Sequence, residues 1–283
     1  MPLATLTEVL KFANENNCAI PAFNIDFMEG IQAIVRGAEE EGNYPIIFNV
    51  GQYAIKDGKL KTLAMLAREA AGRTKVPIVI NLDHGKSYAQ VINCLCEGYT
   101  AVMIDGSHLP LAENIALTSK VVEAASAVGV SVEGELGLIG GMEDNLSVKE
   151  SEAMLVDVEE VKKFTAAVKV DALAVGIGNV HGLYKGEPKL AFDRLKQVRE
   201  VTDVPLVLHG GSGIPDEMIR RAISMGVRKI NVATEIRLAY LEGVVKVTAD
   251  KNGFKDIYKV LESGRQEMIK VIKEKINLFR GRS

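Results

Sequence analysis

Eight short, continuously apolar segments recur along the chain, and segments with helical spacing separate them. The apolar segments cover residues 19–25, 44–50, 76–84, 101–106, 130–137, 172–178, 204–210 and 228–234. Unbroken apolarity is typical of strands that are covered on both faces, as in a parallel sheet. Strand–helix alternation repeated eight times predicts an α/β fold of the (β/α)8 (TIM) barrel type. A doubly wound open sheet is the competing fold.

The chain length fits one such barrel, and we expect residues 1–283 to form a single domain. Residues 137–157 predict a long polar loop after the fifth strand, which is either functional or a plain surface insertion. Beyond the eighth strand the sequence predicts a helical extension, which packs on the barrel or forms a subunit interface. Its last helix carries an apolar stripe of Met268, Ile272, Ile276 and Phe279.

Composition indicates a soluble globular protein and excludes several classes of partner. The chain is 47% hydrophobic and 25% charged, with a formal net charge of -3. Acidic residues outnumber scattered basic ones, so we expect no nucleic-acid partner. No apolar run approaches the ~20 residues of a membrane span, and no secretory signal is visible. The three cysteines, Cys18, Cys94 and Cys96, are then expected to be reduced thiols in a cytoplasmic protein.

Three of the four histidines share one sequence context. His84, His181 and His209 each follow an apolar strand and directly precede a glycine, whereas His108 lies in a loop and precedes Leu109. The carboxyl ends of barrel strands meet at one rim, where barrels carry their chemistry. Three imidazoles at that rim fit a catalytic zinc site with an open fourth position. A single histidine would more simply be a hydrogen-bonded polar residue.

Other polar residues end the strands beside these histidines. Asp83 directly precedes His84, and neighbouring strand residues point to opposite faces unless the chain curls at the strand end. Near a divalent cation its carboxylate stays ionised and exchanges a proton with a substrate, or it orients a ligand histidine. The remaining strand-end residues are Asn24, Asp105, Glu133, Glu135, Asn231 and Thr234.

A glycine-rich segment follows His209. Gly210, Gly211 and Ser212 allow the backbone to approach an anion and to present N–H groups to it. The loops after strands seven and eight commonly bind phosphate in barrels. A metal beside a phosphate site predicts a substrate that is phosphorylated a few atoms from a polarised oxygen.

Six motifs between Leu82 and Glu235 support a more specific assignment, which extends from about Leu6 to Phe279. They are LDHG, VMIDGSHLP, GVSVEGELGLIGGMED, DALAVGIGNVHGLYKGEPKL, PLVLHGGSGIP and KINVATE. Together they resemble the zinc-dependent (class II) ketose-bisphosphate aldolases, with NVATE closer to the tagatose branch. The resemblance implies reversible cleavage of a fructose- or tagatose-type 1,6-bisphosphate to dihydroxyacetone phosphate and glyceraldehyde 3-phosphate. It also implies a homodimer or homotetramer.

The resemblance further implies roles for individual residues. The three histidines would bind Zn2+, Asp83 would exchange the proton of the C4 oxygen, and Glu143 would exchange a proton at C3. Asp105 and Glu135 match a second metal position. The backbone around Val180, Gly182 and Gly210 matches a site for Na+ or K+. Residues that match substrate contacts are Asn24, Gly182, Gly210, Gly211, Ser212, Asn231, Val232, Ala233 and Thr234.

Two positions depart from the family pattern. Tyr258 stands where the family carries the Arg of a DPR motif that grips the distal phosphate, and Gly51 replaces a common serine. Loss of a guanidinium removes a bidentate charged contact to phosphate. The substrate is therefore either a bisphosphate gripped by another basic residue, such as Arg265, or a ketose 1-phosphate.

Three other functions compete with a metal-dependent aldolase. A Schiff-base aldolase needs a lysine inside the barrel, but Lys86 and Lys185 lie in loops and Lys229 lies at the opening of strand eight. Three histidines alone also fit a metal-dependent hydrolase. A non-catalytic sugar-phosphate-binding protein is the third alternative. The presence of every candidate metal ligand and proton-transfer residue argues against a non-catalytic protein. These residues are Asp83, His84, Glu143, His181 and His209.

Overall fold

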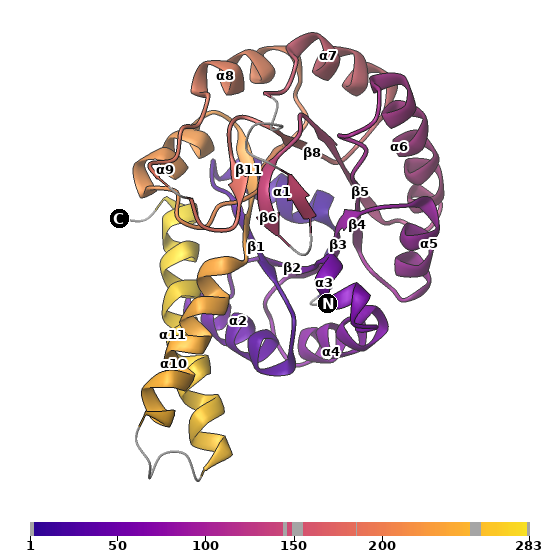
Figure 1. The fold of residues 1–283 in the computed structure, drawn as a ribbon. Coiled ribbons are helices and arrows are strands. Elements are labelled where there is room, and N and C mark those ends of the chain that lie inside the picture. Colours follow the sequence, from indigo (N-terminus) through magenta and orange to yellow (C-terminus); the bar gives the residue numbers. More distant parts are fainter. Residues whose placement is uncertain (1–2, 144–145, 149–154, 185, 250–255, 282–283) are drawn as a thin grey trace.

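Eight parallel strands close into a barrel, as the repeated apolar segments predict (Figure 1). The computed structural model describes residues 3–143, 146–148, 155–184, 186–249 and 256–281. Around the barrel the strands follow the order β1-β11-β10-β8-β5-β4-β3-β2. Their bounds are β1 Ile20–Asn24, β2 Ile46–Val50, β3 Ile78–Gly85, β4 Ala101–Ile104, β5 Ser131–Leu136, β8 Ala172–Val175, β10 Leu206–Leu208 and β11 Val227–Val232.

Helices surround the barrel and alternate with its strands (Figure 1). The first helix begins in a capping box, in which Thr5 and Glu8 satisfy each other's backbone N–H groups. It lies across the amino-terminal rim, where Thr7 contacts Ser131 and Asp171. The helices are α1 Leu6–Glu15, α2 Met28–Glu40, α3 Gln52–Lys56, α4 Leu60–Gly72, α5 Tyr88–Cys96, α6 Leu111–Ser126, α7 Val158–Ala167, α8 Phe192–Val201, α9 Asp216–Ser224, α10 Thr234–Thr248 and α11 Ile257–Arg280.

The predicted apolar stripe of the last helix packs on the rest of the chain. All four of its side chains are buried, and α11 lies along α2 and against β1. Gly37 on α2 permits this approach, because a Cβ there would lie 2.6 Å from Cγ2 of Ile272. Burial of each such side chain contributes about 1.5–3 kcal/mol. The stripe is therefore core packing, and the alternative of a subunit interface does not apply to it.

The long connection after the fifth strand contains a hairpin. Its strands are β6 Gly140–Glu143 and β7 Leu146–Val148, and β6 also pairs in parallel with β9 Val180–His181. The register places Gly141 opposite His181. The hairpin thus lies beside one of the predicted metal ligands, which a plain surface insertion would not require. The side chain of Glu143 lies outside the described residues.

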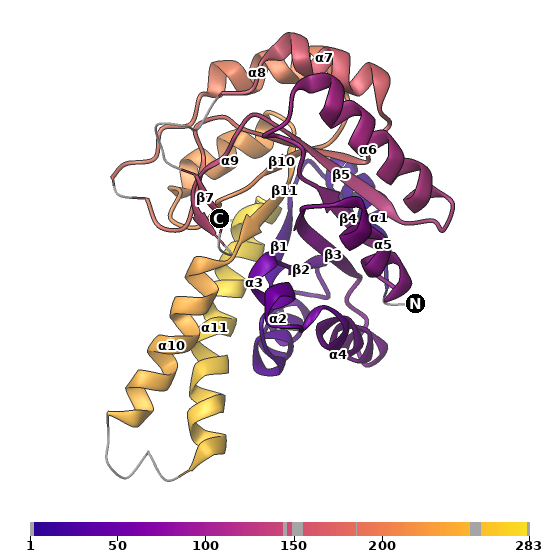
Figure 2. The same cartoon turned by 45° about the vertical axis from the view of Figure 1, so that its right-hand side comes forward.

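The end of α10 and the start of α11 project away from the barrel as an arm (Figure 2). Tyr258, in the first turn of α11, is 79% exposed. Among the described residues, no helix is both long and apolar enough to cross a membrane.

Candidate metal centre

The three predicted histidines converge at the carboxyl rim of the barrel. The ring centroids of His84 and His209 lie 4.6 Å apart, and that of His181 lies 4.9 Å from His84 and 5.8 Å from His209. One nitrogen from each ring lies within 4.8 Å of the others, and all three side chains are buried. Residues that are far apart in the sequence therefore present three nitrogen donors to one point.

The end of β3 curls so that Asp83 and His84 both reach this point. His84 has a φ of +48°, and the register between β3 and β4 shifts between Leu82 and Gly85. A left-handed conformation at a non-glycine residue costs roughly 1–3 kcal/mol and marks a constrained position. Gly85 is required next, because a Cβ there would lie 2.3 Å from the Met103 carbonyl oxygen.

Carboxylates fix two of the rings. His84 Nδ1 lies 3.1 Å from Asp105 Oδ2, and His209 Nε2 lies 3.0 Å from Glu133 Oε1. The opposite nitrogens, His84 Nε2 and His209 Nδ1, then face each other at 2.9 Å. A carboxylate that accepts the outer N–H leaves the inner nitrogen with a lone pair for a metal.

Glycine is also required directly after His209. Gly210 has a φ of +64°, and a Cβ there would lie 2.0 Å from the carbonyl oxygen of Val180. Asn179 Nδ2 donates to the His209 carbonyl at 3.0 Å, which ties β10 to the segment that carries His181. The recurring His–Gly pairs therefore reflect close backbone approaches that bring the rings together.

The pKa values of the three histidines diverge. Burial lowers the pKa of His84, but the hydrogen bond with Asp105 and the charge of Asp83 outweigh burial and raise it well above the ordinary value. Burial and the neighbouring His84 charge lower the pKa values of His181 and His209 well below their ordinary value. A divalent cation that binds in place of a proton on His84 would gain three neutral nitrogen ligands.

Two buried oxygens also fit a bound metal and substrate. Asp83 Oδ2 and Asn231 Oδ1 have no hydrogen-bond partner within the described part of the chain. Asn231 Nδ2 donates to Asp83 Oδ1 at 3.1 Å, which fixes the carboxylate orientation. Buried acceptors without partners are costly, so such atoms indicate a place for a ligand donor or a cation.

A second group of potential metal ligands shares the His84 side chain with the three histidines. His84, Asp105 and Glu135 present atoms within 4.8 Å of one another, as the predicted second metal position requires. Burial and the Asp105 charge raise the pKa of Glu135 well above its ordinary value. Burial opposes ionisation of Asp105 too, but the hydrogen bond with His84 lowers its pKa.

Comparisons with known proteins agree with this geometry. The model of the class-II fructose-bisphosphate aldolase family matches residues 4–282. A fructose-bisphosphate aldolase from Geobacillus stearothermophilus is 41% identical over 282 residues, which cover 99% of this chain and 97% of that protein. The chain belongs to the class II fructose-bisphosphate aldolase family. It is an aldolase, a carbon–carbon lyase of a family that generally depends on a metal.

Solved structures of aldolases share the fold. The YdjI aldolase from Escherichia coli K12 matches with a TM-score of 0.86 at 30% identity, covering 98% of this chain and 97% of that one. A fructose-bisphosphate aldolase from Campylobacter jejuni matches with a TM-score of 0.82 at 24% identity, covering 98% and 95%. At that lower identity the likeness shows the fold alone.

In this class II aldolase the predicted phosphate segment lies beside the start of α10. The N–H of Gly213 donates to Glu235 Oε1 at 2.8 Å, and the N–H of Glu235 donates to Ser212 Oγ at 3.4 Å. The Gly211 N–H donates to the Asn231 carbonyl at 2.9 Å, so this amide already has a partner in the protein. The other predicted contacts surround the same corner: Val232 ends β11, Ala233 is the N-cap of α10 and Thr234 begins it.

The predicted monovalent-cation site contains a tyrosine that the sequence did not indicate. The hydroxyl of Tyr184 accepts from the Val180 N–H at 3.2 Å and donates to the Gly210 carbonyl at 3.1 Å. Gly182, the third predicted residue, has a φ of +87°. Asn24, predicted as a substrate contact, is buried at the carboxyl end of β1.

The prediction for Lys229 was wrong, because this lysine lies inside the barrel of the aldolase. It is fully buried, and its Nζ lies 2.6 Å from Glu133 Oε2. The other oxygen of that carboxylate contacts His209. Lys229 alternates with Asn231 along β11, so both side chains face inward. Paired in this way, the ammonium of Lys229 contacts the carboxylate that fixes His209, a predicted metal ligand, and is not a free nucleophile.

Proposed function

We propose that this protein is a zinc-dependent aldolase that reversibly cleaves the C3–C4 bond of a phosphorylated ketose. Its products are dihydroxyacetone phosphate and an aldehyde. The observation that carries the proposal is that one carboxylate, Asp83, lies beside three buried imidazole nitrogens on a barrel rim. Three nitrogen ligands with an open position suit zinc. When bound, the ion would supply Lewis-acid stabilisation of the negative charge that develops on the substrate oxygens.

Asp83 acts at the bond that breaks. Its Oδ2 takes the proton of the C4 hydroxyl, the C4 oxygen forms the aldehyde carbonyl, and the C3–C4 electron pair remains on the dihydroxyacetone phosphate portion. Asn231 holds the other carboxylate oxygen and so keeps Oδ2 directed at the substrate. In the reverse direction Asp83 returns the proton to the new hydroxyl.

A second proton must reach C3 after the aldehyde leaves. We assign this transfer to Glu143, the last residue of β6, the strand that pairs with the segment carrying His181. The 1-phosphate is assigned to the corner formed by Gly210, Ser212 and the amino terminus of α10, where backbone N–H groups and the helix dipole favour an anion.

The test is an activity screen of the zinc-loaded protein over ketose phosphates, with release of dihydroxyacetone phosphate as the readout. We expect turnover that a chelator abolishes and that zinc restores. Borohydride in the presence of substrate should trap no adduct, because Lys229 is ion-paired. Chelator-resistant turnover with a borohydride-trapped lysine would overturn the proposal in favour of Schiff-base chemistry.

A further inference from the structure

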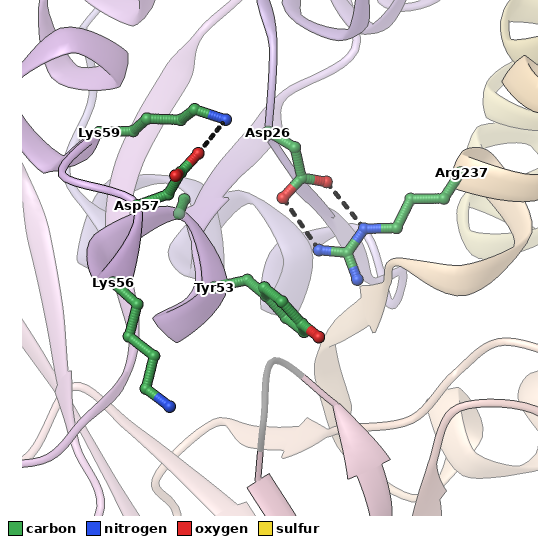
Figure 3. Close-up of a pocket in the computed structure, with 7 residues that line it drawn as sticks. Asp26, Tyr53, Lys56, Asp57, Lys59 and Arg237 are labelled. Atoms are coloured by element: carbon green, nitrogen blue, oxygen red, sulfur yellow. Dashed lines mark hydrogen bonds and ion pairs between the residues drawn. The ribbon is translucent and has the colours of Figure 1, made fainter.

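A cavity of about 640 Å³ opens on the same rim as the metal centre (Figure 3). Its walls come from segments that follow the carboxyl ends of three adjacent strands, β11, β1 and β2. The polar residues that line it are Asp26, Tyr53, Lys56, Asp57, Lys59 and Arg237. A volume of this size accommodates a small ligand.

Two residues that adjoin the cavity, Gln52 and Asn231, donate hydrogen bonds to Asp83. Gln52, which precedes Tyr53 in α3, is buried and donates its Nε2 to the Asp83 carbonyl at 3.2 Å. Asn231, on the strand that leads into α10 and Arg237, donates to the Asp83 carboxylate. Because Asp83 is assigned to the C4 hydroxyl, the substrate carbons beyond C4 extend past Asp83 toward this cavity.

The charges of the cavity are mostly paired with one another. Arg237 donates from Nε and Nη2 to the two carboxylate oxygens of Asp26 at 2.7 and 3.0 Å. Lys59 lies 2.7 Å from Asp57. The Lys56 side chain points away from the Asp26–Arg237 pair (Figure 3). The Nε–Nη2 edge of the guanidinium is therefore already occupied by a carboxylate.

Such paired charges suit hydroxyl groups better than a phosphate. Two of the three cations that line the cavity, Lys59 and Arg237, are paired with carboxylates that a phosphate would also face. A hydroxyl group can instead donate to a carboxylate and accept from other donors. Asp26 offers about four lone-pair sites, of which Arg237 uses two. Tyr53 is 54% exposed and lines the same cavity as the Asp26–Arg237 pair (Figure 3).

We propose that this cavity binds the uncharged, hydroxyl-bearing tail of a ketose 1-phosphate, so that the aldehyde released is an unphosphorylated hydroxyaldehyde. This inference rests on the proposed function. Asp26 accepts a hydrogen bond from a tail hydroxyl, and the Tyr53 hydroxyl contacts the next one. Neither of the two unusual positions supplies a compensating charge, because Gly51 has no side chain and Tyr258 is neutral.

The test compares matched substrates on the zinc-loaded protein. We expect fructose 1-phosphate and tagatose 1-phosphate to be cleaved with a kcat/KM about tenfold or more above that of the corresponding 1,6-bisphosphates. Equal values, or a preference for a bisphosphate, would overturn the cavity assignment. A bisphosphate preference that disappears in Lys56→Gln or Arg265→Gln would name the residue that binds the second phosphate.

Proton exchange separates this proposal from the proposed function. Exchange at C3 of dihydroxyacetone phosphate in D2O, followed by NMR, needs the metal centre but no aldehyde. Exchange without cleavage of any 1-phosphate would contradict the cavity assignment and leave the proposed function standing. Absence of both exchange and cleavage in the zinc-loaded protein would overturn the proposed function and the cavity assignment with it.

Substitutions in the cavity test whether its side chains determine the preference for an unphosphorylated tail. In Asp26→Asn, the rate of condensation of dihydroxyacetone phosphate with glyceraldehyde, relative to exchange, should fall about tenfold, because a charged acceptor is lost. Tyr53→Phe removes an exposed hydroxyl, is not expected to disturb folding, and should lower the same ratio about threefold. The matched control is Arg36→Gln, which breaks the exposed pair with Glu40 on α2 and should leave the ratio unchanged. An unchanged ratio in both cavity variants would contradict the assignment.

Discussion

The metal centre and the neighbouring cavity share one rim, yet they are built in opposite ways. Every histidine of the centre is buried, and carboxylates from other strands fix two of the rings. The cavity is lined by side chains from α3, α10 and the segments that follow β1 and α3, and four of its charged residues form two ion pairs. On the two proposals made above, the centre would carry the chemistry and the cavity would select the substrate tail.

The largest expected effect follows from removal of a ligand in the buried centre. His209→Ala deletes one of three nitrogen donors and also leaves Glu133 with one contact fewer. We expect zinc affinity to fall more than about a hundredfold. Cleavage and C3 proton exchange should both be lost for every substrate, as measured by zinc competition with a chromogenic chelator and by NMR. Full exchange with unchanged zinc binding would show that the ring is no metal ligand.

Asp83→Ala should separate the two halves of the reaction. Loss of the general base lowers cleavage by about 10²–10⁴-fold. Exchange at C3 of dihydroxyacetone phosphate should persist, since that step does not use the C4 proton. Steady-state cleavage and NMR exchange on the same sample measure both. Near-normal cleavage by the variant would refute the role of Asp83 at C4, and a far-ultraviolet spectrum controls for folding.

The sequence predicted the centre far better than the features that support or adjoin it. The position of each histidine directly after an apolar segment predicts a place at a strand end, and closure of the barrel brings those strand ends together. The pairing of Lys229 with Glu133 joins residues 96 positions apart, and nothing local to Lys229 indicates that it faces inward. The Tyr184 contacts depend likewise on the path of a loop. Barrel closure is encoded in repetition, but individual cross-barrel contacts are encoded only in three-dimensional packing.

Variants of the buried Lys229–Glu133 ion pair test whether its charges stabilise the fold around the metal centre. Lys229→Met leaves the Glu133 carboxylate buried with no cation beside it, which should cost about 3–5 kcal/mol in the free energy of unfolding. Urea denaturation of the apoprotein measures this change. The double variant Glu133→Gln/Lys229→Met removes both charges and should recover most of that stability.

The same variants also report on zinc binding. Glutamine keeps an acceptor for the His209 N–H, so the double variant should bind zinc within about tenfold of the unaltered protein. If Lys229→Met were as stable as the unaltered protein, the buried pair would contribute nothing to the fold. A double variant that is stable but loses zinc binding would assign to the Glu133 charge a direct part in holding the ion.

The smallest effect is expected at the outer edge of the cavity, at the exposed pair formed by Lys59 and Asp57. Lys59→Gln removes a charge that solvent already screens, so the KM for the 1-phosphate substrate should change by no more than about threefold, with kcat constant. Steady-state kinetics at low and high salt measure this. A large fall in kcat would mean that the cavity takes part in the chemical step, and the division between a fixed centre and a selective cavity would fail. A change confined to KM would instead show that the Lys59–Asp57 pair acts on substrate binding alone, as a selective cavity requires.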